Sequence, residues 1–304
     1  MSGSGAKIAS VEAAAQLMPQ VADLRPGQRF RGDYACARKD RLTTRNGSAY
    51  LALELRDRSG TIPARLFRDV DRLSARFERG DAIRVAGKAD RFRGELVVEL
   101  EDVERIESSD AEVERFLPAA YRDRAELEGF LEHLTREVHD DALRQVVESL
   151  LFGGHVAEEF RRAPCTRAGH HSYLGGLLEH TVAVGTLVGE LCQLHPRLDS
   201  DLLMAAALLH DVGKVREFDY RADFELSDEG RLLGHLAIGA EIISGAADGL
   251  SDEHRAALLH CVLTHHGAES TRGQRGFGSP EALALYRLNA LDASVKGALE
   301  HGLS

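Results

Sequence analysis

The chain has 304 residues, of which 43% are hydrophobic and 29% are charged, and its formal net charge is −11. This length has room for two domains, and no apolar stretch approaches the roughly 20 residues that a membrane span needs. We therefore expect a globular protein with no membrane partner, and the start MSGSGAKIAS, which lacks the apolar run of a secretory signal, predicts a cytoplasmic location.

Residues 1–20 are predicted to be an N-terminal extension, and a pattern of alternating apolar and polar residues begins at Arg29. Five segments show this pattern over strand length: RFRGDYACA, SAYLALELRD, TIPARLF, DAIRVAGKADRF and ELVVELEDVERI. Turn residues separate them, and a short helical pattern over residues 69–77 lies between the third and the fourth. Five strands with a helix after the third is the order of an OB-fold barrel, which we predict for residues 21–106.

The predicted barrel is basic, although the whole chain is acidic. Residues 25–93 hold 18 Lys and Arg against 9 Asp and Glu, a net of +9, and the remainder holds 20 against 40, a net of −20. OB barrels commonly hold single-stranded nucleic acid in a basic groove with aromatic platforms for the bases. The candidate contacts are Tyr34, Arg38, Lys39, Arg45, Tyr50, Phe67 and Phe92. The alternative is a solvated arginine-rich surface whose aromatic rings belong to the barrel core.

After a polar, acidic linker at residues 107–121, the alternating pattern does not recur and the apolar spacing becomes helical. Asp123 and Asp140 are typical helix N-caps, and Gly153-Gly154 is a typical helix stop. Further helical patterns cover residues 174–194, 200–209, 232–243, 252–265 and 280–299. We therefore predict a multidomain β + α chain, in which the five-stranded barrel is followed by an all-α domain over residues 122–304.

Four cysteines, Cys36, Cys165, Cys192 and Cys261, are scattered along the chain without a CxxC pair. In a cytoplasmic protein such cysteines are usually reduced and buried, so we expect packing residues.

The strongest chemical signal is LLMAAALLHDVGK at residues 202–214, an apolar helix that ends in His210 and Asp211. A buried charge is costly unless something binds it, and imidazole with carboxylate suits a divalent cation such as Mn, Fe, Zn or Mg. Other side chains of ligand type recur in the helical patterns: His180, His235, His265, His266 and Asp292. This order, H…HD…H…HH…D, resembles the HD superfamily of metal-dependent phosphohydrolases.

Asp211 is predicted to bridge two cations, because a carboxylate can serve two metals while an imidazole serves one. The first predicted site is His180, His210, Asp211 and Asp292. The second predicted site is Asp211, His235, His265 and His266. A single cation is the alternative.

Three further side chains are candidates for contact with the substrate. Lys214, one turn beyond Asp211, is expected to bring its ammonium to a phosphate oxygen during catalysis, although a lysine also suits a helix C-terminus. His170 and His171 are expected to contact the nucleic acid, with a purely structural role in the loop after Pro164 as the alternative.

Linked motifs along the chain resemble the YhaM family, bacterial 3′-5′ exoribonucleases that join an N-terminal OB-fold to an HD domain. They are HHSYLGGLLEHT, LLHDVGK, DEGRLLGHLAIGAE, LTHHG and PEALALYRLNALDA. The resemblance implies two cations, most typically Mn²⁺, with Mg²⁺, Fe²⁺ or Ni²⁺ as alternatives, and single-stranded RNA or DNA as the substrate. It carries the ligand role to His180, His210, Asp211 and Asp292, with His235, His265 and His266 as the second set. The segment AESTRGQRGFGSP and a shorter C-terminal tail depart from the family, so the number of subunits, a homo-oligomer included, stays open.

The expected chemistry is hydrolysis of phosphodiesters. Two cations about 3.5–4 Å apart neutralise the phosphate and acidify a water that attacks phosphorus, which leaves 5′-mononucleotides. One alternative is an HD phosphohydrolase or phosphodiesterase that acts on nucleotides or cyclic dinucleotides, although a free nucleotide needs no barrel to hold a strand. The other is a nucleic-acid-binding adaptor whose HD domain is structural, which the complete ligand set disfavours.

Overall fold

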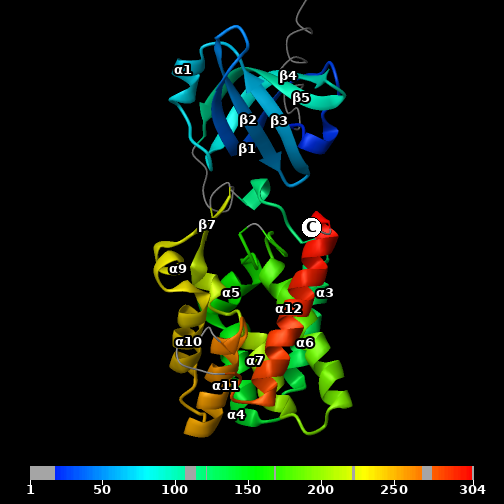
Figure 1. Cartoon of the computed structure of the whole chain (residues 1–304), viewed down its shortest axis with the longest axis vertical. Coiled ribbons are helices and arrows are strands. Elements are labelled where there is room, and N and C mark those ends of the chain that lie inside the picture. The colour runs from blue at the N-terminus through cyan, green and yellow to red at the C-terminus, as the bar shows by residue number, and fades with distance from the viewer. Residues whose placement is uncertain are drawn as a thin grey trace, which may run out of the picture. The chain divides into compact units, whose positions relative to one another are not determined.

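The computed structural model describes residues 18–106, 114–120, 122–167, 169–220, 223–268 and 276–302. The chain divides into two compact units, and the first comprises the described residues up to Leu117 together with Asp223. One unit is built of strands and the other mainly of helices (Figure 1). Most of the predicted extension and linker, at residues 1–17, 107–113 and 121, lies outside the described residues, and the predicted domain boundaries stay predictions.

The first unit is a closed barrel of five strands in the order β1-β2-β3-β5-β4. The strands are β1 (Arg29–Thr43), β2 (Ala49–Asp57), β3 (Gly60–Leu66), β4 (Ala82–Phe92) and β5 (Glu95–Arg105). Strands β3 and β5 pair in parallel and the other neighbours are antiparallel. The short helix α1 (Val70–Ser74) follows β3, and 3-10 turns lie at Val21–Asp23 and Glu114–Phe116. The predicted OB-fold is confirmed.

Alternation along the strands builds the barrel core. Leu51, Leu53 and Leu55 on β2 are all buried, while the residues between them are partly exposed. Closure also needs one close approach between backbones: β4 and β5 shift register between Ala86 and Gly87. A Cβ atom on Gly87 would lie 2.5 Å from the carbonyl oxygen of Glu99, so glycine is required at that bulge.

The second unit is helical, as predicted. Its longer helices are α3 (Arg124–Arg136), α4 (Asp141–Leu151), α5 (Gly154–Arg162), α6 (Gly176–Leu194), α7 (Ser200–Leu209), α10 (Gly234–Ala246), α11 (Asp252–Thr264) and α12 (Pro280–His301). Asp123 and Asp140 cap α3 and α4 by accepting hydrogen bonds from backbone N–H groups of the first turn. No helix in the described ranges combines the length and apolar character needed to cross a membrane.

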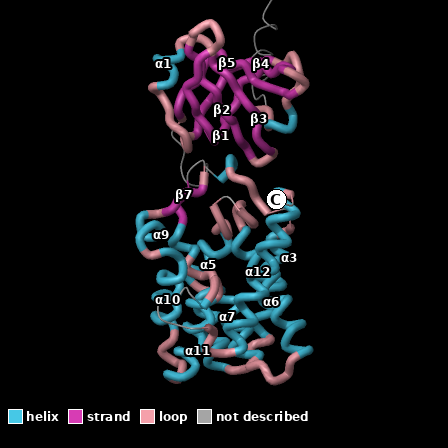
Figure 2. Tube along the Cα trace, viewed as in Figure 1, coloured by secondary structure: helices cyan, strands magenta, loops and turns pink. Residues whose placement is uncertain are grey.

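The prediction of an all-α domain missed a small hairpin between two short helices. The helices are α8 (Lys214–Glu217) and α9 (Asp228–Leu232), and the hairpin strands are β6 (Phe218–Tyr220) and β7 (Phe224–Leu226). Figure 2 shows this hairpin in the strand colour within the helical unit. Strands of 3 residues are too short for an alternating pattern to stand out in the sequence.

Helix α7 lies at the centre of the helical unit. Every residue from Leu202 to Leu209 is buried, and α7 packs against α6, α11, α4 and α12. A helix that is apolar on all sides is stable only when other elements surround it. The residues that follow it, His210 and Asp211, are therefore placed inside the unit.

Candidate metal centre

Three histidines are each held through Nδ1, which leaves Nε2 of each ring with a lone pair and without its proton, here called a bare nitrogen. The Nδ1 atom of His210 lies 2.7 Å from the carbonyl oxygen of Ala207, and that of His265 lies 2.6 Å from the carbonyl oxygen of Val262. A carbonyl oxygen only accepts, so each Nδ1 carries the proton and each Nε2 carries a lone pair. His235 is held in the same way by Glu217, with Nδ1 3.0 Å from Oε1. Metal-ligating histidines are commonly oriented through such a bond on the second nitrogen.

The two carboxylate oxygens of Asp211 face two different sets of bare nitrogens. Oδ2 lies 3.3 Å from Nε2 of His210 and 3.7 Å from Nε2 of His180. Oδ1 lies 3.4 Å from Nε2 of His265 and 3.5 Å from Nε2 of His235. Asp211 therefore belongs to two groups whose donor atoms lie within 4.8 Å of one another, His180–His210–Asp211 and Asp211–His235–His265–His266.

This arrangement fits cations because lone-pair atoms face one another. Asp211 Oδ1 and His265 Nε2 are buried and have no hydrogen-bond partner among the described residues. Two buried acceptors at this distance repel unless a positive charge lies between them, and buried polar atoms are rarely left unpaired. The first group is fully buried, whereas the second opens to solvent at His266.

The protonation states of the side chains also suit a cation. Burial lowers the pKa of His180, lowers that of His265 to about 3 and lowers that of His266 to about 4, so these imidazoles are neutral near pH 7. Burial raises the pKa of Asp211, but the ammonium of Lys214 and the His210 ring outweigh it and hold that pKa well below the usual value.

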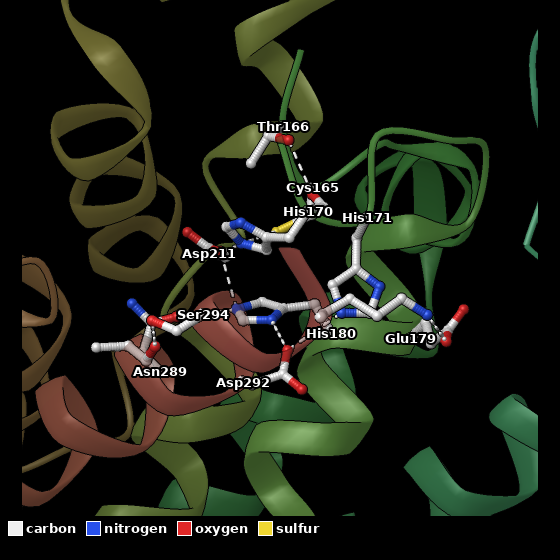
Figure 3. Close-up of polar contacts among 12 residues, drawn as sticks. Cys165, Thr166, His170, His171, Glu179, His180, Asp211, Asn289, Asp292 and Ser294 are labelled. Atoms are coloured by element: carbon white, nitrogen blue, oxygen red, sulfur yellow. Dashed lines mark hydrogen bonds and ion pairs between the residues drawn. The ribbon is translucent and has the colours of Figure 1, made fainter. Parts of the chain in front are cut away.

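Asp292 does not join His210 and Asp211 as predicted. Its Oδ2 atom lies 2.7 Å from Nδ1 of His180, the ring nitrogen on the other side from the cluster, and 3.1 Å from Nε2 of His171. Asn289, one turn earlier on α12, instead places Oδ1 3.0 Å from Nε2 of His180. Figure 3 shows Asn289 and Asp292 reaching the His180 ring from different directions. Asp292 was predicted from the resemblance and from its place in an apolar helix, and its ligand role stays a prediction; His171, His180 and Asp292 form a further group whose donor atoms lie within 4.8 Å of one another.

His171 is buried beside the site, so the prediction that it contacts nucleic acid is corrected. Its side chain is 1% exposed, with Nδ1 2.8 Å from the Tyr173 hydroxyl and Nε2 against Asp292. His170 is partly exposed, and its predicted contact with nucleic acid stays a prediction. Lys214 is buried and donates to Asp211 Oδ2 at 2.7 Å, so its predicted phosphate contact also stays a prediction.

Part of the predicted nucleic-acid surface of the barrel is exposed. Tyr50 and Phe67 stack with ring centroids 5.3 Å apart, and Phe67 is 44% exposed. Phe92 is 45% exposed, and the guanidinium of Arg65 lies 4.2 Å from its ring centroid. Two other predicted contacts, Arg38 and Arg45, lie on β1 and in the turn after it, and Arg38 pairs with Asp40.

Two predicted contacts on the barrel are corrected because they are structural. Tyr34 is fully buried in the barrel core, where its hydroxyl donates to the carbonyl of Pro19, so no base can stack on it. The ammonium of Lys39 donates to the carbonyls of Ser74 and Phe77 and to Glu78. Because all three donors are engaged, Lys39 stabilises the chain around α1.

Sequence reasoning missed three side chains at the centre. Asn289 carries no charge, and Glu217 looks like an ordinary surface acid one turn past Lys214. Cys165 was expected to be a packing residue, and it is indeed free and buried, but its Sγ atom lies 3.4 Å from the Lys214 ammonium. Two sequence signals could have indicated these side chains. Glu217 lies one helical turn after Lys214, and Cys165 lies in the same short loop as His170.

Both units of the chain are similar to known proteins. The HD domain profile matches residues 177–295, and the profile described as an OB-fold nucleic acid binding domain matches residues 36–106. The chain is 30% identical over 278 residues to the 3'-5' exoribonuclease YhaM of Oceanobacillus iheyensis, covering 88% of this chain and 85% of that protein. It is 29% identical over 266 residues to the protein of the same name from Bacillus pumilus, covering 84% and 83%. Among solved structures, the second OB-fold domain of replication protein A from Methanococcus maripaludis matches with 19% identity and a TM-score of 0.25, covering 30% of this chain and 96% of that chain.

Histidines with lowered pKa values predict that the metal-free protein loses stability in mild acid. The usual histidine pKa is about 6.5, so below that pH the unfolded chain binds protons that His265 and His266 do not bind when folded. The free energy of unfolding therefore falls as the pH drops from about 6.5 towards about 4, and the lowered pKa of Asp211 extends the loss to lower pH. Urea denaturation with a chelator, followed by helical circular dichroism at a series of pH values, measures this slope.

Replacing His265 with Asn removes one of these groups, so the decline becomes shallower. His133→Asn, at an exposed position on α3, is the matched control and keeps the wild-type slope. Equal slopes in all three proteins would contradict the assignment.

Proposed function

Because this chain belongs to the YhaM family of 3'-5' exoribonucleases, we propose that it shortens single-stranded RNA from the 3′ end and releases 5′-mononucleotides. The chain is accordingly a metal-dependent phosphodiesterase with an HD domain. The observation that carries the proposal is the position of Asp211, whose two oxygens each face a separate pair of bare imidazole nitrogens. We propose single-stranded DNA as a further substrate and residues 21–106 and 122–304 as the two functional domains.

The proposed ligands form two sets that share Asp211. His180, His210 and Asp211 Oδ2 would hold one cation, and Asp211 Oδ1 with His235, His265 and His266 would hold the other. We propose that both cations are Mn²⁺. Together they would neutralise the phosphate and lower the pKa of a bound water. Three imidazoles and a carboxylate suit Mn²⁺, Fe²⁺ or Zn²⁺ better than Mg²⁺, which prefers oxygen ligands.

The remaining residues of the centre prepare these ligands. Asp292 accepts from Nδ1 of His180 and so fixes which nitrogen of that ring is bare. His171 in turn contacts Asp292 through Nε2 and is itself held by the Tyr173 hydroxyl at Nδ1. Lys214 supplies a buried positive charge at Asp211 Oδ2, from which its ammonium would turn to a phosphate oxygen as charge develops there. Asp292 is thus proposed as a positioning residue.

Glycine in the HDVGK motif allows the second set to approach Asp211. A Cβ atom on Gly213 would lie 2.0 Å from the carbonyl oxygen of His235 and 2.5 Å from the backbone nitrogen of Gly239. Any other residue would therefore push α10 away from the turn that carries Asp211. Because Gly213 lies two residues after Asp211, its missing side chain lets His235 pack close to the Asp211 carboxylate.

The barrel supports a strand as the substrate. Tyr50, Phe67 and Phe92 present exposed or partly exposed rings, and Arg65 and Arg93 lie close to the Phe92 ring. Aromatic rings with guanidinium groups are how OB-folds hold unpaired bases and their phosphates. A free nucleotide or a cyclic dinucleotide would not need such a surface.

The central activity test removes the shared carboxylate. Single-stranded RNA labelled at the 5′ end and incubated with Mn²⁺ should shorten step by step in the wild type. Asp211→Ala should lower the rate by about 1000-fold or more, because several kcal/mol of transition-state stabilisation are lost. Asp219→Ala, which removes an exposed carboxylate on β6, is the control and should retain the wild-type rate.

An Asp211→Ala variant with more than a tenth of the wild-type rate would contradict the bridging role. Intact RNA together with hydrolysis of a nucleotide or cyclic dinucleotide would instead assign the centre to small substrates.

A second test addresses the barrel surface. Phe67→Ala should weaken binding of single-stranded RNA by about 5- to 150-fold, which corresponds to the roughly 1–3 kcal/mol of one stacked base. Fluorescence anisotropy with a chelator present measures binding without cleavage. Phe130→Ala removes a ring that is exposed to a similar degree, 41%, on α3, and should leave the affinity unchanged. Equal affinities for wild type and Phe67→Ala would remove this face of the barrel from the substrate path.

A further inference from the structure

A third group of ligand-type side chains lies next to the first proposed site. Donor atoms of Cys165, His170 and His180 lie within 4.8 Å of one another. The Sγ atom of Cys165 is 3.7 Å from Nε2 of His170, and no other hydrogen-bond partner of this Nε2 is found among the described residues. Cys165 and His170 come from the loop between α5 and α6, and His180 comes from α6.

The loop holds the thiol and the imidazole together through its own hydrogen bonds. The Cys165 backbone N–H donates to the carbonyl of His171 at 3.0 Å. The Thr166 hydroxyl donates to the carbonyl of His170 at 2.8 Å and accepts from the backbone N–H of Gly169 at 2.9 Å. Figure 3 shows Cys165, His170 and His180 gathered beside Asp211. The pairing of Cys165 with His170 is therefore built into the loop and does not depend on a cation.

The chemistry of this group differs from that of the two proposed sites. A thiolate is a soft ligand, and a thiolate with two imidazoles is a donor set that Zn²⁺ and Cd²⁺ prefer over Mn²⁺. The Sγ atom lies 3.4 Å from the Lys214 ammonium and 3.8 Å from Oδ2 of Asp211. Burial raises the pKa of this thiol to about 12, so a bound cation would displace the thiol proton.

His180 can serve only one cation at a time. Its Nδ1 atom is engaged by Asp292 at 2.7 Å, which leaves only Nε2, 3.0 Å from Asn289 Oδ1, for a cation. That nitrogen also faces His210 Nε2, at 3.2 Å, in the first proposed site. A cation held by Cys165 and His170 would therefore take His180 away from that site.

We propose that Cys165, His170 and His180 form a binding position for a thiophilic divalent cation, Zn²⁺ or Cd²⁺, and that its occupation excludes a cation at His180–His210–Asp211. The position rests on the three side chains alone. The consequence rests on the proposed function: a thiophilic cation inhibits the Mn²⁺-dependent reaction by capturing His180.

The test titrates metal-free, full-length protein with Cd²⁺ and records the near-ultraviolet band of a cadmium thiolate. The wild type should develop this band at about one equivalent of Cd²⁺. Cys165→Ser should abolish the band, and His170→Ala should weaken Cd²⁺ binding by about 10-fold or more. Cys192→Ser, which changes the partly exposed cysteine on α6, should keep the wild-type band. A band that is absent from the wild type, or unchanged in Cys165→Ser, overturns the proposal.

A second measurement tests the exclusion. Excess Mn²⁺ should weaken the cadmium band of the wild type in a competitive manner, and Cd²⁺ should inhibit RNA shortening by the wild type at a concentration at least 10-fold lower than for Cys165→Ser. A band that is indifferent to Mn²⁺ overturns the exclusion. The band reports binding without any reaction, so it distinguishes this proposal from the proposed function, whose failure appears as intact RNA in Mn²⁺ alone.

Discussion

The centre depends on one electrostatic constraint, a buried carboxylate surrounded by atoms that carry lone pairs. Asp211 is 1% exposed, and bare imidazole nitrogens face both of its oxygens within 3.7 Å. Such a cluster is repulsive without positive charge, and Lys214 supplies charge only at Oδ2. The unpaired Oδ1 is therefore the strongest single argument for a cation in this structure. Helix α7 is buried on all sides, and this burial places the Asp211 carboxylate at its C-terminal end inside the helical unit.

The supporting side chains orient the proposed histidine ligands without the help of a cation. Carbonyls hold His210 and His265, and carboxylates hold His180 and His235, each through Nδ1. Since burial keeps His180 and His265 neutral, no proton has to leave these two rings on binding. Under the proposed function, the acidic helical unit would hold the cations and the basic barrel would present rings and guanidinium groups to a strand.

Periodicity and motif order were sufficient to predict the architecture but not every role. The period-2 segments predicted the barrel because half of each strand faces a core, and the HDVGK turn predicted the cluster because buried charges need partners. The same reasoning placed Asp292 beside His180 but did not predict that it faces Nδ1 of that ring, while Asn289, one turn earlier, faces Nε2. Tyr34 and Lys39 were predicted to bind nucleic acid because a sequence shows the residue type but not its tertiary contacts. In the fold, the Tyr34 ring is buried and backbone carbonyls accept hydrogen bonds from the Lys39 ammonium. Cys165 illustrates the same limit, because its neighbours His180 and Lys214 lie far along the chain.

The most direct measurement is an anomalous difference map from crystals of the full chain soaked in Mn²⁺. Two peaks are expected, one on each side of the Asp211 carboxylate. The first should be bound by His180 and His210, and the second by His235, His265 and His266. A single peak, or peaks that leave either oxygen of Asp211 without a cation, would contradict the claim that this carboxylate bridges a pair.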